Sequence, residues 1–498
     1  MKTNTKKIIV LIILGIGFVF LPNIKLNFSV DQKTNLSILK ESGGYSEPFI
    51  HIDGSIPGNW SDTVSDYPWC DGSGTWNDPY IIENVTINAI NSPTGSGIYI
   101  NNSMNDYFTI RNCTVYNAGW GEYNANIKLE NTCNGTLIDN TCSTSARNGI
   151  FLFTNCKNNT ISGNTANGNS YGIRLYNYCD YNTVSGNSAN NNSDHGIYLY
   201  DCDYNTVSGN TACNNTHEGI FLVFCNNNTI SGNTANGNIV GICIYYDCDY
   251  NTITGNTANG NGFGIFIYYS DYNNITGNTA KDNDNAGIQF ELHCDYNTIT
   301  ENFFVKNAKH AIDFDGVIKI DNKWNSTTIG NYWDNHTGPD ANSDGIVDNP
   351  YTFIDGPSDM VDYLPIAEDG APRITIVSPS EGQRFGRDAP TFEIEVVDIY
   401  VWEMWYTIDG GLHNYTFTEN EMINQSAWDA LLDGSVIIRF YAIDIVGNVA
   451  FEEVSVLKNV PSGLDPGVIT TIVIVSIVGG VAVIAGVYIF MKKRATQE

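Results

Sequence analysis

The chain has 498 residues and carries 54 acidic against 24 basic side chains, which gives a formal net charge of −30. Nucleic acids and anionic lipid surfaces are bound through basic patches, so this charge argues against both as partners and favours solubility or cation binding. A chain of this length is expected to hold several domains.

The first segment in chain order is a predicted signal peptide, residues 1–24. Lysines at its start precede an apolar stretch at 8–21, which is the pattern and length of a secretory signal. We therefore expect an exported protein. Residues 45–96 follow, and their turn-rich phrase GSGTWNDPYIIENVTI predicts an N-terminal cap that leads into the repeats below.

Residues 97–320 repeat with a period of about 23 residues. One landmark is a glycine followed by isoleucine, which recurs at Gly149, Gly172, Gly196, Gly219, Gly241, Gly264 and Gly287. A second is the asparagine of the phrase SGN or TGN, at Asn164, Asn187, Asn210, Asn233, Asn256 and Asn278. Self-similarity at such a period is typical of a solenoid with one coil per repeat.

Each repeat contains short strands and no helix. Aliphatic residues alternate in GIFLF, GIRLY and GICIY, which is the period of a half-buried strand, and NTI or NTV forms a second strand. Gly, Asn and Thr are too frequent for a helix to form. The sequence therefore predicts an all-β protein built on a right-handed parallel β-helix. Its strand phase predicts one buried column made of Ile150, Ile173, Ile197, Ile220, Ile242, Ile265 and Ile288.

Two further columns are interpreted as structural. The SGN asparagines are expected to hydrogen-bond from coil to coil, as side chains do in cross-β stacks. A cysteine column, in which Ser270 replaces one member, consists of Cys133, Cys156, Cys179, Cys202, Cys225, Cys248 and Cys294. Stacked Cβ atoms lie about 4.8 Å apart, wider than the usual disulfide spacing, so buried free thiols are favoured. Disulfides are the alternative in an exported protein.

The residues between the buried aliphatics of the GI strands are expected to face outward. Most of them are aromatic, namely Phe151, Phe153, Tyr176, Tyr198, Tyr200, Phe221, Tyr245, Phe266 and Tyr268. Such rings would form a flat stripe several coils long, and stacked rings suit the faces of sugars. The stripe is therefore predicted to bind carbohydrate. The alternative is a cross-strand ladder that only stabilises the sheet.

One polar cluster falls beside this stripe and supplies the candidate catalytic residues: Arg174, Asp194, His195, His217 and Glu218. In the repeat register His195 and Glu218 share one column, and Asp194 and His217 share the next. A polysaccharide lyase needs a base and a cation that holds the uronate, whereas a hydrolase needs paired carboxylates. The cluster offers parts of each. The alternative is a group of polar residues without a catalytic role.

Another column is acidic and consists of Asp180, Asp203, Asp249, Asp271 and Asp295, interrupted by Asn226. Carboxylates at this spacing repel each other by about 1 kcal/mol per neighbour even in water. We therefore expect either bound cations or side chains that splay apart.

Residues 321–368 are predicted to be a closing coil whose aromatic residues cover the open end of the β-helix. Within it, the spacing of a calcium loop is matched by Asp340, Asn342, Asp344, Ile346 and Asp348. These ligands predict calcium as a cofactor. The last ligand position is Tyr351, so the missing carboxylate would have to come from Asp355, Asp359 or Asp362. The alternative is an Asx-rich turn.

The C-terminal part of the chain changes character. Residues 371–458 contain short alternating strands that predict a small immunoglobulin-like β-sandwich, and 459–467 is a linker. The uncharged apolar stretch 468–491 is long enough to span a bilayer, and the basic residues in 492–498 predict that this tail is cytoplasmic. We therefore expect a single-pass cell-surface protein with its bulk outside.

The units NTISGNTA and GIxLxxC resemble the right-handed β-helix repeats of the NosD and CASH (carbohydrate-binding and sugar hydrolase) group. GTWNDPYIIEN and NYWDNHTGPDANSDGIVDNPY are similar to the group's opening and closing segments, so the resemblance covers roughly residues 60–365. It implies kinship with pectate-lyase-like polysaccharide enzymes and with non-enzymatic surface proteins. Copper sites need clustered Met, His or accessible Cys, which this chain lacks in sequence, so copper is not expected. A nucleotide cofactor is not expected either.

The sequence leaves three functions open. The first is a membrane-anchored surface protein that binds carbohydrate or envelope components through its aromatic and acidic face. The second is an anchored polysaccharide lyase, hydrolase or epimerase of the pectate-lyase-like type. The third is a structural component of the cell envelope.

Overall fold

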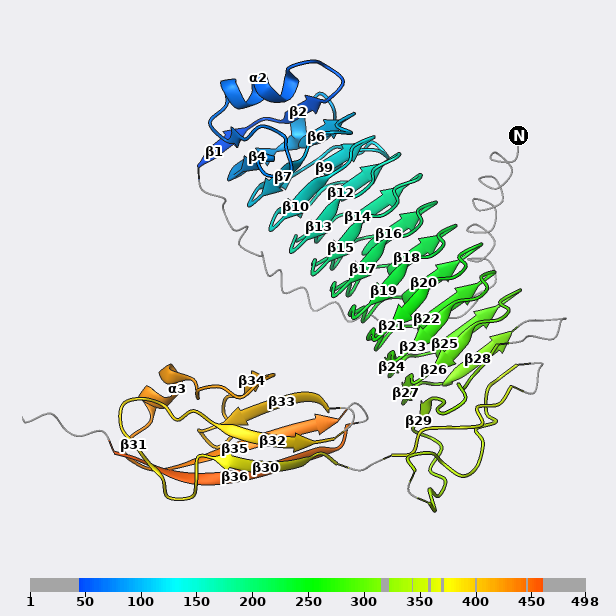
Figure 1. The fold of residues 1–498 in the computed structure, drawn as a ribbon, viewed down its shortest axis with the longest axis vertical. Helices are drawn as coiled ribbons and strands as arrows, with labels where there is room; N and C mark the ends of the chain where they lie inside the picture. Colours follow the sequence, from blue (N-terminus) through cyan, green and yellow to red (C-terminus); the bar gives the residue numbers. More distant parts are fainter. Residues whose placement is uncertain are drawn as a thin grey trace, which may run out of the picture. The chain divides into compact units, whose positions relative to one another are not determined.

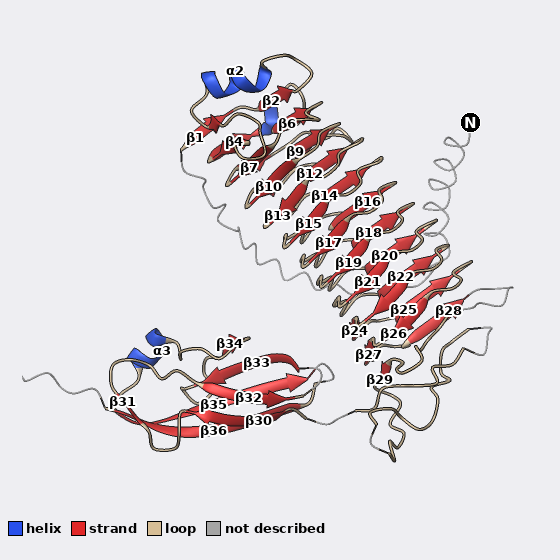
Figure 2. Cartoon of the chain, viewed as in Figure 1, coloured by secondary structure: helices blue, strands red, loops and turns tan. Residues whose placement is uncertain are grey.

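The computed structural model describes residues 44–314, 322–342, 344–356, 360–368, 371–398, 401–444 and 447–459. The predicted signal peptide, membrane segment and cytoplasmic tail lie outside these ranges. Among the described residues, no helix is both long and apolar enough to cross a membrane. The described ranges are all-β apart from short helices (Figure 2).

Residues 45–314 fold as the predicted right-handed parallel β-helix, in which each strand lies above its equivalent in the preceding coil (Figure 1). The strands that begin near the Gly-Ile pair form an eleven-stranded sheet, which we call the GI sheet. Its members are β2 (Ile50–Asp53), β6 (Ile98–Asn101), β9 (Ala125–Glu130), β12 (Asn148–Phe153), β14 (Tyr171–Tyr176), β16 (Ile197–Tyr200), β18 (Glu218–Val223), β20 (Val240–Tyr245), β22 (Phe263–Tyr268), β25 (Ala286–Glu291) and β28 (Ala311–Phe314).

A second eleven-stranded sheet contains the NTI and NTV strands and is called the NT sheet. Its members are β3 (Cys70–Asp71), β4 (Tyr80–Glu83), β7 (Phe108–Arg111), β10 (Gly135–Ile138), β13 (Thr160–Ser162), β15 (Thr183–Ser185), β17 (Thr206–Ser208), β19 (Thr229–Ser231), β21 (Thr252–Thr254), β23 (Asn274–Thr276) and β26 (Thr298–Thr300). Only the first pair, β3 with β4, is antiparallel within this sheet.

The third side of each coil is less regular. It begins with β1 (Tyr45–Glu47), β5 (Val85–Asn88), β8 (Thr114–Tyr116) and β11 (Thr141–Ser143) and ends with β24 (Thr279–Lys281), β27 (Phe303–Val305) and β29 (Tyr332–Trp333). Single parallel bridges from Thr141 to Thr279 connect the two parts. Because β1, β2, β4 and β5 already pair in these sheets, the β-helix starts earlier than the predicted boundary at residue 97.

The predicted strand phase is confirmed. Ile150, Ile173, Ile197, Ile220, Ile242, Ile265 and Ile288 pair in register and are each fully buried. The glycine before each isoleucine is needed because the coils approach closely there: a Cβ at Gly172 would lie 2.5 Å from the carbonyl oxygen of Gly196. The cysteine column is also buried, and all twelve cysteines are unpaired, so free thiols are the state found.

The SGN asparagines form the expected buried ladder, and two more ladders accompany it. In the first, the Asn187 amide donates to Asn210 Oδ1 and the Asn210 amide donates to Asn233 Oδ1, both at 2.9 Å. The second ladder consists of Asn159, Asn182, Asn205, Asn228, Asn251, Asn273 and Asn297, and the third of Asn169, Asn192, Asn215, Asn238, Asn261 and Asn283. Asparagine side chains therefore join neighbouring coils at three separate points of the turn.

Both ends of the β-helix core are covered. Helix α2 (Asn59–Asp66) buries Trp60 against Tyr80 at the N-terminal end, with ring centroids 4.7 Å apart, and a 3-10 helix follows at Ala89–Asn91. At the C-terminal end Trp333 stacks on Tyr351 at 4.1 Å and on Phe304 at 4.7 Å. This confirms the aromatic cover predicted for the closing coil.

Residues 371–459 form a separate hydrophobic core between two sheets. One sheet pairs β30 (Arg373–Ser378) with β32 (Glu393–Val397). The other has the order β31 (Arg384–Phe385), β36 (Val449–Lys458), β35 (Gly434–Asp444), β33 (Val401–Thr407) and β34 (Tyr415–Phe417), with helix α3 (Gln425–Ala430) beside it. Phe392, Tyr406, Trp428 and Phe440 are buried between the sheets. The immunoglobulin-like type of this domain stays a prediction.

The ladder at Asn210 supports a stability test. Asn210→Ala would leave the Asn187 backbone N–H and the Val184 carbonyl without their side-chain partners in a buried site. Because each orphaned buried group costs about 1–3 kcal/mol, we expect the free energy of unfolding to fall by about 3 kcal/mol or more. Chemical denaturation followed by circular dichroism measures this change.

Ser208→Ala is the matched control, since Ser208 lies on the outer face of the same coil. Its effect should stay within about 0.5 kcal/mol. Equal effects of the two substitutions would show that the ladder contributes no more than the outer surface does.

Candidate functional site

The nine predicted carbohydrate-binding rings do lie on the outer face of the GI sheet, but they do not form an exposed flat stripe. Phe151, Phe221 and Tyr200 are 0%, 5% and 7% exposed, and the other six rings are half-buried. The rings face outward as expected, but they do not form the expected flat, accessible stripe, because rings on adjacent strands cover one another. Tyr176 stacks on Tyr200 at 4.7 Å, and Tyr198 stacks on Phe221 at 5.3 Å.

A loop adds to this cover at one end of the face. Tyr123 contacts Phe153 at 4.9 Å and Phe151 at 6.5 Å, measured between ring centroids. Trp120 in the same loop is 88% exposed. The outer face is therefore a layer of packed rings whose accessible part consists of Phe153, Tyr171, Tyr176, Tyr198, Tyr245, Phe266 and Tyr268.

Arg174 is enclosed by this layer and is only 4% exposed. Its guanidinium carbon lies 4.6–5.5 Å from the centroids of four rings, those of Phe151, Tyr171, Tyr176 and Tyr198. Its Nη2 is 3.9 Å from Glu122 Oε1. Cation–π contacts and one carboxylate thus stabilise the charge. Arg174 supports the ring layer and is not presented to a carboxylate on a ligand.

The other candidate catalytic residues are brought together as predicted. His195 lies between two carboxylates, with Nδ1 2.7 Å from Glu218 Oε2 and Nε2 3.3 Å from Asp194 Oδ1. The His217 ring centroid is 5.8 Å from that of His195. The side chains of His195 and Glu218 are 12% and 18% exposed, so both are mostly covered.

The electrostatics of this cluster follow from burial and from the pairing. Burial raises the pKa of Glu218, but the adjacent His195 outweighs it, so the pKa of this carboxyl lies below its ordinary value. Burial, followed by the charge of Asp194, raises the pKa of Tyr171. Glu218 is thus held as a carboxylate by His195. The cluster can accept hydrogen bonds from hydroxyl groups at its edge, and it carries two carboxylates, one guanidinium and two imidazoles.

Sequence reasoning missed a row of exposed rings in the turns of the β-helix. Tyr181, Tyr204, Tyr250, Tyr272 and Tyr296 follow the acidic column in the turn between the GI and NT sheets and are 45–57% exposed. Stacked neighbours are 4.9–5.0 Å apart with nearly parallel rings. We call them the tyrosine ladder. The repeated phrase CDYN contained the signal, but periodicity on strands does not locate side chains in turns.

The acidic column has a third arrangement that the sequence did not suggest. The first four carboxylates each accept the backbone N–H of the equivalent residue in the next coil: for example, Asp203 N donates to Asp180 Oδ1 at 3.0 Å and Asp271 N donates to Asp249 Oδ1 at 2.8 Å. Asn226 accepts from Asp249 N in the same way. Backbone dipoles therefore offset the repulsion. Burial, the largest cause, raises the pKa of Asp203, Asp249 and Asp271.

The predicted calcium loop is a compact exposed turn. Asp340 accepts the backbone N–H groups of Asp344 and Gly345 at 3.1 and 2.9 Å, and Asp348 accepts that of Ala341 at 3.0 Å. Asn342 and Ile346 take part in the same turn through Asp344. Asp355 pairs with Lys309 and buried Asp362 accepts from Trp333, so neither completes the loop, and Asp359 lies outside the described residues.

In the part of the chain that the structure describes, no group of three or more His, Cys, Asp or Glu side chains is arranged to hold a metal ion. Cys133 Sγ lies 3.8 Å from Met104 Sδ, but two sulfur atoms alone do not complete a copper site.

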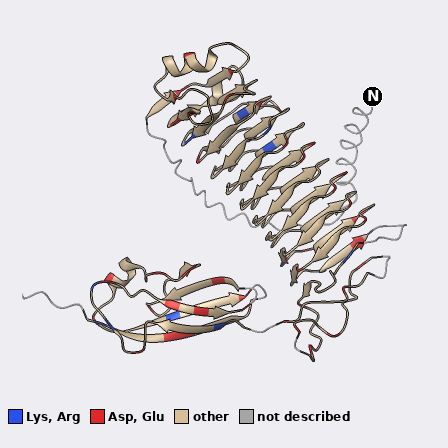
Figure 3. Cartoon of the chain, in the orientation of Figure 1, with Lys and Arg blue, Asp and Glu red and all other residues tan. Residues whose placement is uncertain are grey.

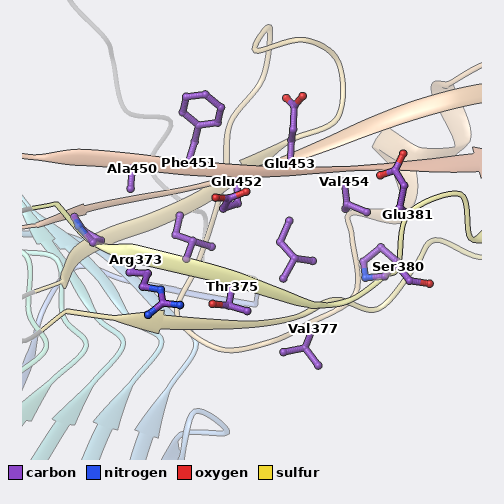
Figure 4. A pocket seen from close by; sticks show the side chains of 14 residues that line it. Arg373, Thr375, Val377, Ser380, Glu381, Ala450, Phe451, Glu452, Glu453 and Val454 are labelled. Atoms are coloured by element: carbon purple, nitrogen blue, oxygen red, sulfur yellow. The ribbon is translucent and has the colours of Figure 1, made fainter.

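A hollow of about 740 Å³ lies in the C-terminal domain between β30 and β36 (Figure 4). Its lining includes Arg373, Glu381, Glu452 and Glu453. In Figure 4 several of these side chains point away from one another, and they form no convergent set of reactive groups. We assign no function to this hollow.

Two family models match the sequence. Residues 213–338 match the family described as periplasmic copper-binding protein (NosD), and residues 71–179 and 96–258 match the right handed beta helix region. Together with the stacked coils, these matches support the expected kinship with right-handed β-helix proteins. No curated protein sequence matches the chain significantly.

The solved structures that match this chain share little sequence with it and superpose poorly. The periplasmic alginate epimerase AlgG is 14% identical, with 55% of this chain and 82% of that chain covered and a TM-score of 0.34. The mannuronan C-5 epimerase AlgE6 A-module of Azotobacter vinelandii is 16% identical, with 50% of this chain and 84% of that chain covered and a TM-score of 0.34. Tailspike protein 2 of Escherichia coli O157:H7 bacteriophage CAB120 is 12% identical, with 74% of this chain and 59% of that chain covered and a TM-score of 0.36. TM-scores below 0.5 give no information about function.

The acidic column generates a pH prediction. A raised folded-state pKa stabilises the protein below the unfolded value of about 3.8, and this contribution is lost as the pH rises through the folded value. Asp249→Asn keeps an acceptor for Asp271 N and removes the charge. The variant should therefore be more stable than the wild type at pH 7 and equally stable near pH 3.5.

Asn226→Asp is the reverse test, because it adds a carboxylate to the same column. It should lower the melting temperature at pH 7 and have no effect near pH 3.5. Melting curves recorded across this range by circular dichroism check both variants. A pH-independent difference for either variant would contradict the role given to burial of these carboxylates.

Proposed function

We propose that the protein binds neutral polysaccharide through the outer face of its GI sheet. The observation that carries this proposal is the packed ring layer with half-exposed aromatic residues beside the Asp194, His195 and Glu218 cluster. Ring faces supply apolar contact area for a sugar, and a few polar groups set its orientation. Because adjacent rings hold one another in place, little side-chain freedom is lost on binding.

The charges favour a neutral glycan over a uronan. Carboxylates outnumber cationic groups around the face, and Arg174 is already occupied by four rings and Glu122. Figure 3 shows that acidic residues lie mostly at the turns of the β-helix and that Lys and Arg are sparse on its strands. A polyanion would approach a chain of net charge −30 against repulsion.

The cellular setting in this proposal is the outer surface of a membrane. It rests on the sequence patterns of 1–24 and 468–491, both outside the described residues. In this arrangement the C-terminal β-domain would separate the β-helix from the membrane. A purely structural role in the envelope is the alternative if no glycan binds.

A binding experiment tests the proposed face. Tyr176→Ala and Tyr245→Ala each remove a half-exposed ring, and each should weaken binding of neutral oligosaccharides roughly tenfold, equal to about 1.4 kcal/mol. Isothermal titration with cello-, xylo- and manno-oligosaccharides measures the affinity. Trp76→Ala removes a ring that is 76% exposed on another loop and should leave affinity unchanged.

Tyr200→Ala serves as the packing control, because this ring is nearly buried. It should lower stability, as should Ile220→Ala, for which a core cavity costs about 2–5 kcal/mol. If Tyr176→Ala and Tyr245→Ala lower stability as much as Ile220→Ala and leave every affinity unchanged, the ring layer is a packing device only.

Catalysis is the second candidate function, and the pairing of His195 with two carboxylates is the observation that favours it. The same oligosaccharides, together with alginate and polygalacturonate, are incubated with the protein and analysed for new reducing ends and unsaturated uronate. If the wild type releases such products and His195→Gln does not, the function is hydrolysis or elimination of a polysaccharide and not binding alone.

We also propose that calcium draws the loop at 340–348 together, since the carboxylates of its described residues are not grouped into a metal site in the structure. The ligands would be carboxylate and amide oxygens from Asp340, Asn342, Asp344 and Asp348 and the backbone carbonyl of Ile346. The chelator EGTA should lower the melting temperature of the wild type, and Asp344→Ala should abolish that difference. Asp284→Ala, an exposed substitution outside the loop, should retain it. Equal melting temperatures of the wild type with and without chelator would reduce the loop to a turn.

A further inference from the structure

The tyrosine ladder occupies backbone positions that do not favour tyrosine. All five residues have φ between 57° and 61°, the left-handed region that bulky residues rarely adopt. At the equivalent position of neighbouring coils stand Asn134, Asn158 and Asn227, and asparagine tolerates this conformation well. Stability alone therefore favours asparagine at this position. Tyrosines retained here against local preference point to a role for their rings.

The ladder is interrupted at one coil. Tyr181 stacks on Tyr204 at 5.0 Å, and Tyr250 stacks on Tyr272 at 5.0 Å, but Asn227 stands between Tyr204 and Tyr250. The backbone continues through this coil without a break, because Tyr204 N donates to Asn226 O and Asn227 N donates to Asp249 O. Tyr204 and Tyr250 are thus two coils apart, which separates their rings by about 10 Å.

This separation leaves room for one ring that continues the stack, about 5 Å from the ring on either side. Rings with only one stacked neighbour are more exposed than the ring with two, and Tyr204 at the gap is 49% exposed. Tyr272 is stacked on both faces and is 45% exposed, whereas Tyr250 is stacked on one face and is 57% exposed. The exposed side chain of Asn227 is shorter than tyrosine and does not fill the space between the two rings.

The polar groups around the gap suit a polyhydroxylated ring. Asn226 replaces aspartate in the acidic column at this same coil, so the coil at the gap carries two adjacent amide side chains, and Asn226 Oδ1 accepts the Asp249 N–H. Asp203 and Asp249 flank it. Asp203 already accepts a backbone and a side-chain hydrogen bond from Asn226, whereas Asp249 uses Oδ1 to accept the Asp271 N–H, which leaves its second carboxylate oxygen for a hydroxyl group. The carboxylates disfavour phosphorylated ligands such as nucleotides. Stacking with hydroxyl recognition is the pattern of sugar binding.

We propose that the gap at Asn227 is a slot that binds one neutral pyranose ring of a glycan between Tyr204 and Tyr250. The slot lies in the turn between the GI and NT sheets and is therefore distinct from the ring layer on the outer face of the GI sheet. It shares with the proposed function only the class of ligand. A polysaccharide held at both places would contact two sides of the same coils.

The decisive variant is Asn227→Tyr, which fills the slot with the residue that the ladder itself uses. The substitution restores a continuous stack, so the folded state should be kept and the melting temperature unchanged or raised. The probes are cellohexaose, xylohexaose and mannohexaose. Binding is measured by isothermal titration and by the ultraviolet difference spectrum of tyrosine. We expect the slot component of binding to weaken roughly tenfold or more.

Asn158→Tyr is the matched control, since it makes the same substitution in the same left-handed turn, one coil before Tyr181. It extends the ladder and leaves the slot open, so binding should stay as in the wild type. Asn226→Asp replaces the amide next to the slot by a carboxylate and should weaken binding less than Asn227→Tyr does.

The outcomes separate the slot from the outer face. Loss of binding in Asn227→Tyr with retention in Asn158→Tyr supports the slot, whatever Tyr176→Ala does. Binding that is weakened by Tyr176→Ala but unchanged in Asn227→Tyr overturns the slot and leaves the face standing. The absence of any oligosaccharide binding by the wild type overturns it as well. Free indole is a further probe, because it can stack between tyrosines without offering hydroxyl groups. Binding of indole without binding of any of the three oligosaccharides would also overturn the proposed sugar slot.

Discussion

The structure depends on the hydrogen bond between asparagine amides of successive coils. Each buried amide of the SGN ladder donates to a carbonyl of the preceding coil and to the asparagine Oδ1 of the next coil. Its own Oδ1 accepts from the backbone and side-chain N–H groups of the preceding asparagine, as Asn210 Oδ1 does from Asn187. A buried amide with an unmet partner is costly, so the ladder holds only if every coil supplies asparagine at the same place. Three such ladders fix the turns of the coil and thereby fix the spacing of everything outside them.

The fold was predictable because this constraint is written into the sequence as exact recurrence. Gly-Ile, SGN and the cysteine column specify where each coil turns and which face is buried, and the alternation in GIFLF specifies the phase of the strand. Ile150 and its equivalents were assigned correctly for that reason. The second and third asparagine ladders were present in the sequence too, but they lie in phrases whose variation among coils obscured them.

The exposure of outward side chains was not predictable in the same way. Strand parity determines on which side of the sheet a residue lies, whereas exposure depends on the neighbours that cover it. Phe151 is fully buried because Tyr123 from a loop and Arg174 from the next strand pack over it. Likewise the acidic column was analysed as side chains that repel, since the donors that relieve it are backbone N–H groups whose direction only the fold determines. The tyrosine ladder depends on a left-handed turn, which no strand pattern encodes.

A periodic scaffold makes departures from its own pattern informative. Tyrosine in a left-handed turn costs of order 1–3 kcal/mol unless the surroundings compensate, and stacking on the next ring returns about 0.5–1.5 kcal/mol. The balance is close, so a lone tyrosine would be disfavoured and a row of them is tolerated. The coil with Asn226 and Asn227 departs from CDYN at both exposed positions at once, while its buried Cys225 and Asn228 keep to the pattern. The coil at Cys156 to Asn159 departs from CDYN in the same way, but it precedes the ladder, whereas the coil at Asn226 and Asn227 interrupts the ladder between two coils that keep every member. The departure is confined to the surface, and it opens two ring faces toward each other. A binding site is the simplest physical reason for a stack that is built at a local cost and then left open at one place.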